Sequence, residues 1–250
     1  MTSEFRSGVA ALALLAAGLL LAPGHALAAG GAFAVDDSEV GKPGECKVES
    51  WVSFAGNRDL AAATSPACVV NLGIPVDIGG QLQRSRSDSE WGTSGALKAK
   101  VNIISAEGHA FGLGLSGGSG WDLITGASTG GFINVPVTFQ LREDFKININ
   151  GGWMYDATTK ISYATWGAGF EWNFNKALPL TLIGEVYGQE GRLAPVEPDA
   201  APANNSVREP RTQLGLRYTP KENIDVDVIW GRNITGENSN WLTLGVNLRF

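Results

Sequence analysis

The chain has 250 residues, of which 44% are hydrophobic and only 18% are charged, and its formal net charge is −6. This negative charge argues against a nucleic-acid partner, because such partners favour basic surfaces. The 33 glycines, 8 tryptophans and 10 phenylalanines suit a β-rich protein better than a helical one.

The N-terminus has the pattern of an export signal. Arg6 precedes the uncharged run GVAALALLAAGLLLA, which is followed by Pro23-Gly24 and then by a small-x-small ALA motif. This order predicts a secretory signal peptide over residues 1–28. A transmembrane helix is the alternative, but the run is shorter than the about 20 residues that a bilayer requires.

After the signal, the sequence divides into a lead segment and a β-domain. Residues 29–43 lack a strand pattern, and we expect them to form a periplasmic lead segment. From about residue 44 onward apolar and polar residues alternate, which predicts strands with one apolar face. Twelve strands are predicted, over about 46–54, 66–74, 77–87, 96–103, 109–118, 133–141, 145–155, 168–174, 180–187, 213–218, 224–230 and 242–250.

The connections between these strands alternate in length. Short turns are expected near 75–76, 106–108, 143–144, 175–177 and 220–222, and longer loops over 57–65, 88–92, 119–129, 156–161, 191–207 and 234–239. Short periplasmic turns and long outer loops are typical of outer-membrane barrels. An even number of strands would place both termini on the periplasmic side.

The two faces of the strands favour a barrel over a secreted β-sandwich. The polar face carries many Gly, Asn, Thr and Gln residues, whereas the outer face of a sandwich is usually dense in charge. Aromatic residues gather near both strand ends, as in the girdles at the two membrane interfaces. The predicted fold class is therefore all-β, a transmembrane up-and-down antiparallel β-barrel of twelve strands over residues 44–250 in the cell outer membrane.

The last strand resembles an assembly signal. TLGVNLRF ends the chain on an aromatic residue and resembles the C-terminal signal by which outer-membrane barrels are recognised. Its key positions are Thr243, Gly245, Leu248 and Phe250, with Leu248 in place of the more usual aromatic residue. Barrel-assembly machinery and outer-membrane lipid are thus predicted partners.

Four stretches resemble one known family. VDDSEVGKPGECKVESWVSFAGNRD, LTLIGEVYGQEG, LGLRYTPKENIDVDVIWG and LTLGVNLRF are similar to bacterial outer-membrane proteins named for the meta-pathway of phenol degradation. The resemblance covers residues 35–250. It implies a transporter-like barrel without catalytic residues. Its motifs are strand and turn patterns, which inform the fold and not the substrate.

Twelve strands lie between the about 8 that side chains fill and the about 16 that leave an open aqueous pore. A passive channel or transporter for a small-molecule solute, with a narrow polar lumen, is therefore the predicted function. A turn centred on Lys221 would bring Arg217 opposite Asp225, and an excess of acidic groups would favour cations. The predicted lumen-facing charges are Glu49, Lys98, Lys100, Glu171, Glu185, Arg217, Asp225 and Asp227.

Three alternatives stay open. The inward charges could neutralise each other and plug the barrel. A structural or adhesive barrel would act through its outer loops. An outer-membrane lipid-modifying enzyme would need a base, and His109 is the one histidine after the signal peptide, in a predicted turn. No catalytic, cofactor-binding or metal-binding residue is predicted.

The two cysteines, Cys46 and Cys68, form no disulfide scaffold. The predicted strands place Cys46 at the periplasmic end of one strand and Cys68 at the outer end of the next. Their separation would exceed the about 7 Å Cα limit for a disulfide. We therefore expect no bond between them.

Overall fold

The computed structural model describes residues 32–175, 178–192, 206–235 and 240–250, so the expected signal peptide lies outside the described residues. Alternating sequence produces long strands throughout. They are β1 (Cys46–Ala55), β2 (Leu60–Asn71), β3 (Pro75–Ser87), β4 (Glu90–Ile104), β5 (Gly112–Asp122), β6 (Ser128–Arg142), β7 (Phe145–Asp156), β8 (Ile161–Asn175), β9 (Leu180–Arg192), β10 (Ser206–Arg208), β11 (Arg211–Lys221), β12 (Ile224–Asn233) and β13 (Asn240–Arg249).

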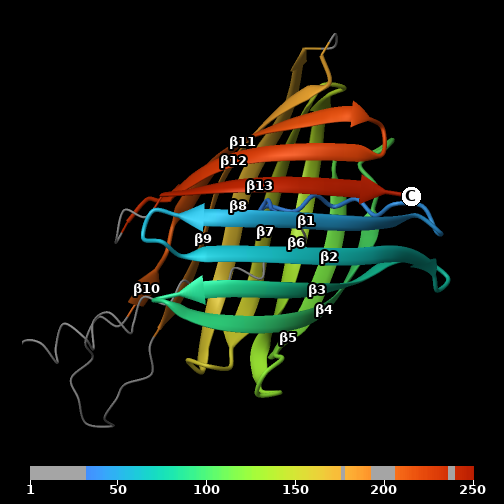
Figure 1. Ribbon diagram of the computed structural model, residues 1–250. Helices are drawn as coiled ribbons and strands as arrows, with labels where there is room; N and C mark the ends of the chain where they lie inside the picture. The colour runs from blue at the N-terminus through green and yellow to red at the C-terminus, as the bar shows by residue number, and fades with distance from the viewer. Residues whose placement is uncertain (1–31, 176–177, 193–205, 236–239) are drawn as a thin grey trace, which may run out of the picture.

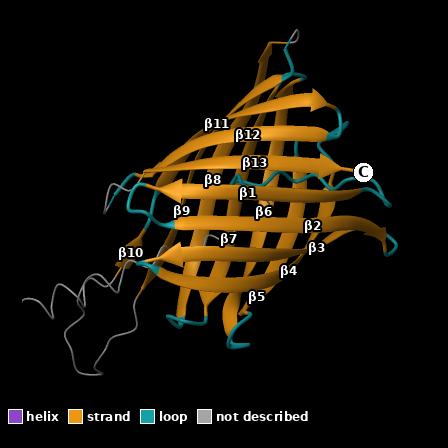
Figure 2. Cartoon of the chain, viewed as in Figure 1, coloured by secondary structure: helices purple, strands orange, loops and turns teal. Residues whose placement is uncertain are grey.

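The strands form one closed antiparallel barrel (Figure 1). β1 pairs with both β2 and β13, and β8 pairs with β9, so the wall has no free edge. The three-residue β10 pairs only with β9, which leaves twelve strands in the wall. The prediction of a twelve-strand up-and-down barrel is confirmed. Among the described residues, no helix is long and apolar enough to cross a membrane, and Figure 2 shows strands joined by loops.

Side chains on the two faces of the wall have opposite character. On β13, Leu244 and Val246 point outward and are 44% and 42% exposed, whereas Thr243 points inward and is 4% exposed. The buried side chains of the interior are largely polar, with asparagine, glutamine, serine and threonine prominent. This inverted distribution is expected of a barrel whose outer face meets lipid and whose interior is polar.

The first hairpin differs from the prediction. The loop expected over 57–65 spans only 56–59, because β2 begins at Leu60 and ends at Asn71. The run LAAATSPACVV is rich in alanine, which is uncommon in strands, so its sequence does not mark the true start of β2. The following tight turn accordingly lies at 72–74 rather than near 75–76.

A second expected loop is also much shorter. β3 continues to Ser87 and β4 begins at Glu90, so their connection consists of Asp88 and Ser89 alone. Both have positive φ, 49° and 72°, which is the backbone of a two-residue hairpin turn of the type that matches strand twist. The expected loop over 88–92 was wrong because its serines and acidic residues resemble a longer turn.

A disulfide joins Cys46 and Cys68, contrary to the prediction. The earlier start of β2 moves Cys68 to the far end of that strand. Cys46 and Cys68 are then directly opposite one another in the β1–β2 register. The disulfide is possible because the first loop is shorter than expected; the limit on the Cα–Cα distance of a disulfide still holds.

The lead segment runs inside the barrel. Residues 29–43 are the expected periplasmic lead segment, and in the structure residues 34–39 of it hydrogen-bond to inward side chains of β4, β6, β7 and β9. Figure 1 shows this segment in blue, passing through the interior. Residues 34–39 belong to no strand, and polar interior side chains accept from the N–H groups of Ala34, Val35, Asp36 and Ser38.

Candidate functional site: the occupied lumen

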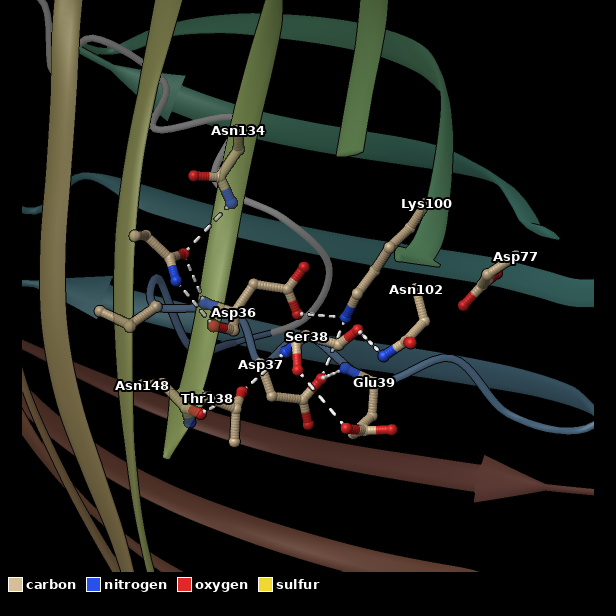
Figure 3. A network of polar contacts seen from close by, with 12 residues as sticks. Asp36, Asp37, Ser38, Glu39, Asp77, Lys100, Asn102, Asn134, Thr138 and Asn148 are labelled. Atoms are coloured by element: carbon tan, nitrogen blue, oxygen red, sulfur yellow. Dashed lines mark hydrogen bonds and ion pairs between the residues drawn. The ribbon is translucent and has the colours of Figure 1, made fainter. Parts of the chain in front are cut away.

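The lead segment is fixed by hydrogen bonds from its backbone. Glu185 on β9 accepts from the N–H groups of Ala34 and Val35 at 3.0 and 3.1 Å. Further along, the N–H of Asp36 donates to Asn150 Oδ1 on β7 at 2.8 Å. The N–H of Ser38 donates to Thr138 Oγ1 on β6, and Asn102 donates to the Ser38 carbonyl, both at 2.8 Å (Figure 3).

Two aspartates add charge to this attachment. Lys100 Nζ on β4 lies 3.0 Å from a carboxylate oxygen of Asp36 and 3.0 Å from one of Asp37. Lys146 on β7 reaches the other oxygen of Asp37 at 3.3 Å and Glu171 on β8 at 2.9 Å. Figure 3 shows Asp36 and Lys100 pointing toward one another in the lumen. Because these groups are largely shielded from bulk water, the Coulomb attraction within each pair is screened less than it is in a surface pair.

Glycines on the inward face make room for the segment. A Cβ at Gly114 would come within 3.1 Å of the Ser38 carbonyl oxygen, and one at Gly167 within 2.9 Å of Val35. The wall strands are therefore adapted to a chain that lies against them. Phe33 extends the contact by packing against Arg217, whose Cζ lies 5.2 Å from the ring centroid.

Two cavities adjoin the lead segment. The larger, about 740 Å³, lies toward the rim formed by the start of β1 and the end of β13, which we call the terminal rim. The smaller, about 60 Å³, is lined by residues of β6 to β9, by Glu209 and Arg211 at the start of β11, and by Ala34. Val35 lines the larger cavity and Ala34 the smaller one, so the segment separates the two.

Seven of the eight predicted lumen charges line the larger cavity: Glu49, Lys98, Lys100, Glu171, Glu185, Arg217 and Asp227. The eighth, Asp225, is inside the wall and only 3% exposed, but it does not line this cavity. The residues that the sequence brings to one face are thus also brought together in space.

The predicted pairing within the β11–β12 hairpin was wrong by one step. Arg217 is opposite Asp227, not Asp225, because the register shifts between Tyr218 and Lys221. Arg217 Nε donates to Asp227 at 2.8 Å. Asp225 instead accepts from Thr219 Oγ1 and from Arg249 on β13. A bulge of this kind cannot be read from residue alternation.

The lead segment supplies partners that residue alternation does not reveal. Asp36 and Asp37 were part of the family resemblance but were not assigned to the lumen. Lys146, which pairs with Asp37 and Glu171, is not among the predicted lumen charges. Lys47, which lies between Glu49 at 3.7 Å and Asp77 at 3.4 Å, was also not assigned. The available signal was the pair of adjacent aspartates just before the first strand.

The residues of the expected assembly signal occupy the closing seam. The N–H and carbonyl of Phe250 both hydrogen-bond to Cys46, at 2.9 and 2.8 Å. Thr243 points inward and donates to Ser53 Oγ, and Gly245 lines the cavity. Leu248 and the Phe250 side chain point outward. Their role in assembly remains a prediction.

His109 does not lie in the lumen site. It belongs to the exposed connection between β4 and β5, and its Nδ1 faces the carbonyl oxygen of Ser105 at 3.0 Å. Within the described ranges, no group of three or more His, Cys, Asp or Glu side chains is arranged to hold a metal ion.

The architecture matches that of solved outer-membrane barrels. The COG4313 outer membrane channel from Pseudomonas putida F1 superposes with a TM-score of 0.61 at 12% identity, over 86% of this chain and 98% of that one. The NanC porin gives 0.59 at 9% identity, over 80% and 98% of the two chains. The KdgM porin gives 0.58 at 9% identity, over 82% and 99%. At these identities the similarity establishes the fold alone.

No curated protein matches the sequence. A family model does match, over residues 17–250, and so covers the lead segment as well as the whole barrel. The chain therefore belongs to the family described as uncharacterised conserved protein UCP029691.

Proposed function

We propose that the protein is a passive outer-membrane channel for small molecules, whose lumen is closed in this state by its own lead segment. The observation that carries the proposal is the attachment of residues 34–39 across the polar interior. A barrel that serves only as a structural anchor does not require polar wall side chains that hydrogen-bond to a segment inside its lumen. Opening would require the segment to leave Lys100 and Lys146.

The fold supports this proposal. Proteins named as porins and as a channel share the architecture, although their solutes are not transferred to this chain. We also propose that both termini lie on the periplasmic side, that the last strand is read by the barrel-assembly machinery, and that the barrels named for the meta-pathway of phenol degradation are relatives. A structural or adhesive barrel is the alternative; an outer-membrane lipid-modifying enzyme is less favoured, because His109 lies in the exposed β4–β5 connection.

Conductance in planar bilayers tests the proposal. The double variant Asp36→Asn, Asp37→Asn removes the charges that Lys100 and Lys146 hold, while it changes the shape of the segment little. Losing one charge-assisted contact shifts an open–closed equilibrium by about tenfold or more. We expect a matching rise in the time-averaged conductance.

Glu107→Gln is the matched control, because Glu107 is an exposed acid in the β4–β5 connection. Its conductance should equal that of the unaltered protein. Equal conductance in all three proteins would contradict gating by the segment. A complete absence of current, in barrels that are shown to be folded, would favour the structural or adhesive alternative.

A further inference from the structure

Two arginines lie on the outward face of β3, near the end of the strand that points away from the terminal rim (Figure 1). Along β3, Ile78 and Leu82 point outward and are 45% and 49% exposed, whereas Gln83 points inward and is 7% exposed. Arg84 and Arg86 alternate in phase with Leu82, so their side chains leave the wall on the side that faces lipid. A cation on this side needs a partner, because lipid chains do not solvate charge.

These arginines lie at the level of aromatic side chains. The inter-strand register aligns one outward row across β1 to β4, which consists of Phe54, Leu60, Arg86 and Trp91. Phe54 and Trp91 are exposed, as expected of aromatic side chains at a membrane interface. Arg84 lies about 7 Å along the strand from Arg86, toward the middle of the wall. Its side chain extends back toward Trp91, as long basic side chains do when they reach for an interface.

Both guanidinium groups gather at one indole ring. The Cζ atoms of Arg84 and Arg86 lie 5.1 and 5.6 Å from the ring centroid of Trp91. Cation–π attraction favours each contact, but two positive charges beside one ring also repel each other. An anion that contacts both guanidinium groups would offset this repulsion.

In the part of the chain that the structure describes, no carboxylate supplies that anion. Arg84 donates to the neutral Oγ1 of Thr93. Arg86 donates to the carbonyl oxygen of Arg58. Together with the Trp91 ring, these are the partners of the two guanidinium groups within the protein. Each guanidinium carries further N–H groups, which are therefore available to a ligand.

The chemistry of the two groups indicates which anion fits. A guanidinium matches phosphate through two parallel hydrogen bonds, which adds geometric selectivity to the charge. A phosphate monoester carries about two negative charges at neutral pH and so balances two arginines, whereas a diester carries only one. Because both side chains lie on the lipid-facing side, the phosphate that reaches them is one attached to a lipid headgroup.

We propose that Arg84, Arg86 and Trp91 bind the phosphomonoester group of a lipid headgroup at this interface. With the orientation proposed above, the interface belongs to the outer leaflet, whose glycolipid, lipid A, carries phosphomonoesters. The choice of leaflet rests on that orientation, whereas the binding of a lipid phosphate rests on the side chains alone.

Native mass spectrometry of the folded full chain, released from detergent, tests the proposal with three lipids. They are lipid A with both phosphates, lipid A from which both phosphates have been removed, and phosphatidylglycerol, which is a phosphodiester. We expect intact lipid A to bind about tenfold more tightly than either of the others, since charge-assisted bidentate contacts are lost or weakened in each. Excess inorganic phosphate should leave lipid A bound.

Three outcomes would overturn the proposal. Equal affinity for the intact and the dephosphorylated lipid A would show that phosphate is not recognised. Tighter binding of phosphatidylglycerol than of lipid A would contradict selection of a monoester. Displacement of lipid A by inorganic phosphate would show that the site does not require a lipid.

The double variant Arg84→Gln, Arg86→Gln assigns the binding to this face. It should lower the affinity for intact lipid A by about tenfold or more, to that of the dephosphorylated form. Its conductance should equal that of the unaltered protein, because neither side chain faces the lumen. A failure of the channel proposal would thus appear in the conductance, and a failure of the lipid site in the mass spectrum.

Arg142→Gln is the matched control. Arg142 also lies over an aromatic ring, with its Cζ 5.7 Å from the ring centroid of Phe145, but it has Asp144 as an ion-pair partner at 3.3 Å. This variant should bind lipid A as the unaltered protein does. An equal loss in Arg142→Gln, or no loss in the folded double variant, would contradict the assigned site.

A second double variant, Arg84→Lys, Arg86→Lys, covers the case in which the glutamine variant does not fold. It retains both charges but not the planar guanidinium, so its affinity for intact lipid A should be intermediate. An affinity equal to that of the unaltered protein would contradict bidentate recognition of the phosphate.

Discussion

At the scale of single residues, the disulfide has a position that links the wall to the lead segment. It joins the first residue of β1 to Cys68. The neighbouring residues of the chain, Gly44 and Glu45, exchange backbone hydrogen bonds with Val69. The bond therefore fixes the point at which the lead segment becomes the first strand.

We predict that the double variant Cys46→Ser, Cys68→Ser lowers the free energy of unfolding by about 2–4 kcal/mol, because the bond closes a loop in the unfolded chain. Urea unfolding in liposomes measures this change. The unaltered protein in reducing agent should show the same loss, and the double variant should be insensitive to the reductant. Labelling of both thiols by maleimide in unreduced, folded protein would mean that the bond is not formed.

At the scale of elements, β13 separates the two environments of the wall. Val246 points outward and is 42% exposed, whereas its neighbour Asn247 points inward opposite Glu49. Lipid cannot solvate a charge, but the interior already holds many. Adjacent positions on β13 should therefore differ in whether they tolerate a charged side chain.

Val246→Arg should lower the free energy of unfolding by about 2–4 kcal/mol if the position lies near the bilayer midplane. Asn247→Arg should change it little, because the new guanidinium lies beside the Glu49 carboxylate. Urea titration of both variants in the same liposomes makes the comparison. Similar losses for the two would contradict the orientation of β13.

At the scale of the whole molecule, the charges of the lumen are unequal in number. The larger cavity is lined by ten acidic and five basic side chains. Most of the basic ones are held in ion pairs, so the net field along the wall is negative. An opened channel should therefore favour cations over anions.

Replacing Asp225 and Asp227 by Asn leaves Arg249 and Arg217 without their carboxylate partners. We expect the potassium-to-chloride permeability ratio to fall in this double variant, because two positive charges are no longer compensated. Reversal potentials in a potassium chloride gradient measure the ratio, with Glu107→Gln as control. A reversal potential that does not move would show that these side chains do not set the selectivity.

Residue alternation and turn spacing were sufficient to predict the barrel, its strand number and its polar interior. Alternation fixes which face each residue joins, because successive side chains of a β-strand point to opposite faces. The same alternation assigns Glu49, Lys98 and Arg217 to one face, and all three line the larger cavity.

Which inward groups meet depends on register and on contacts between distant segments, which the folded chain alone reveals. The alanine-rich start of β2 hid the register that brings Cys46 to Cys68, and a bulge moved Arg217 from Asp225 to Asp227. The lead segment has no periodic pattern, because its backbone is held by side chains from several strands and not by one neighbouring strand. Its place beside Lys100 depends on strands more than 60 residues away in sequence, so local pattern could not reveal it.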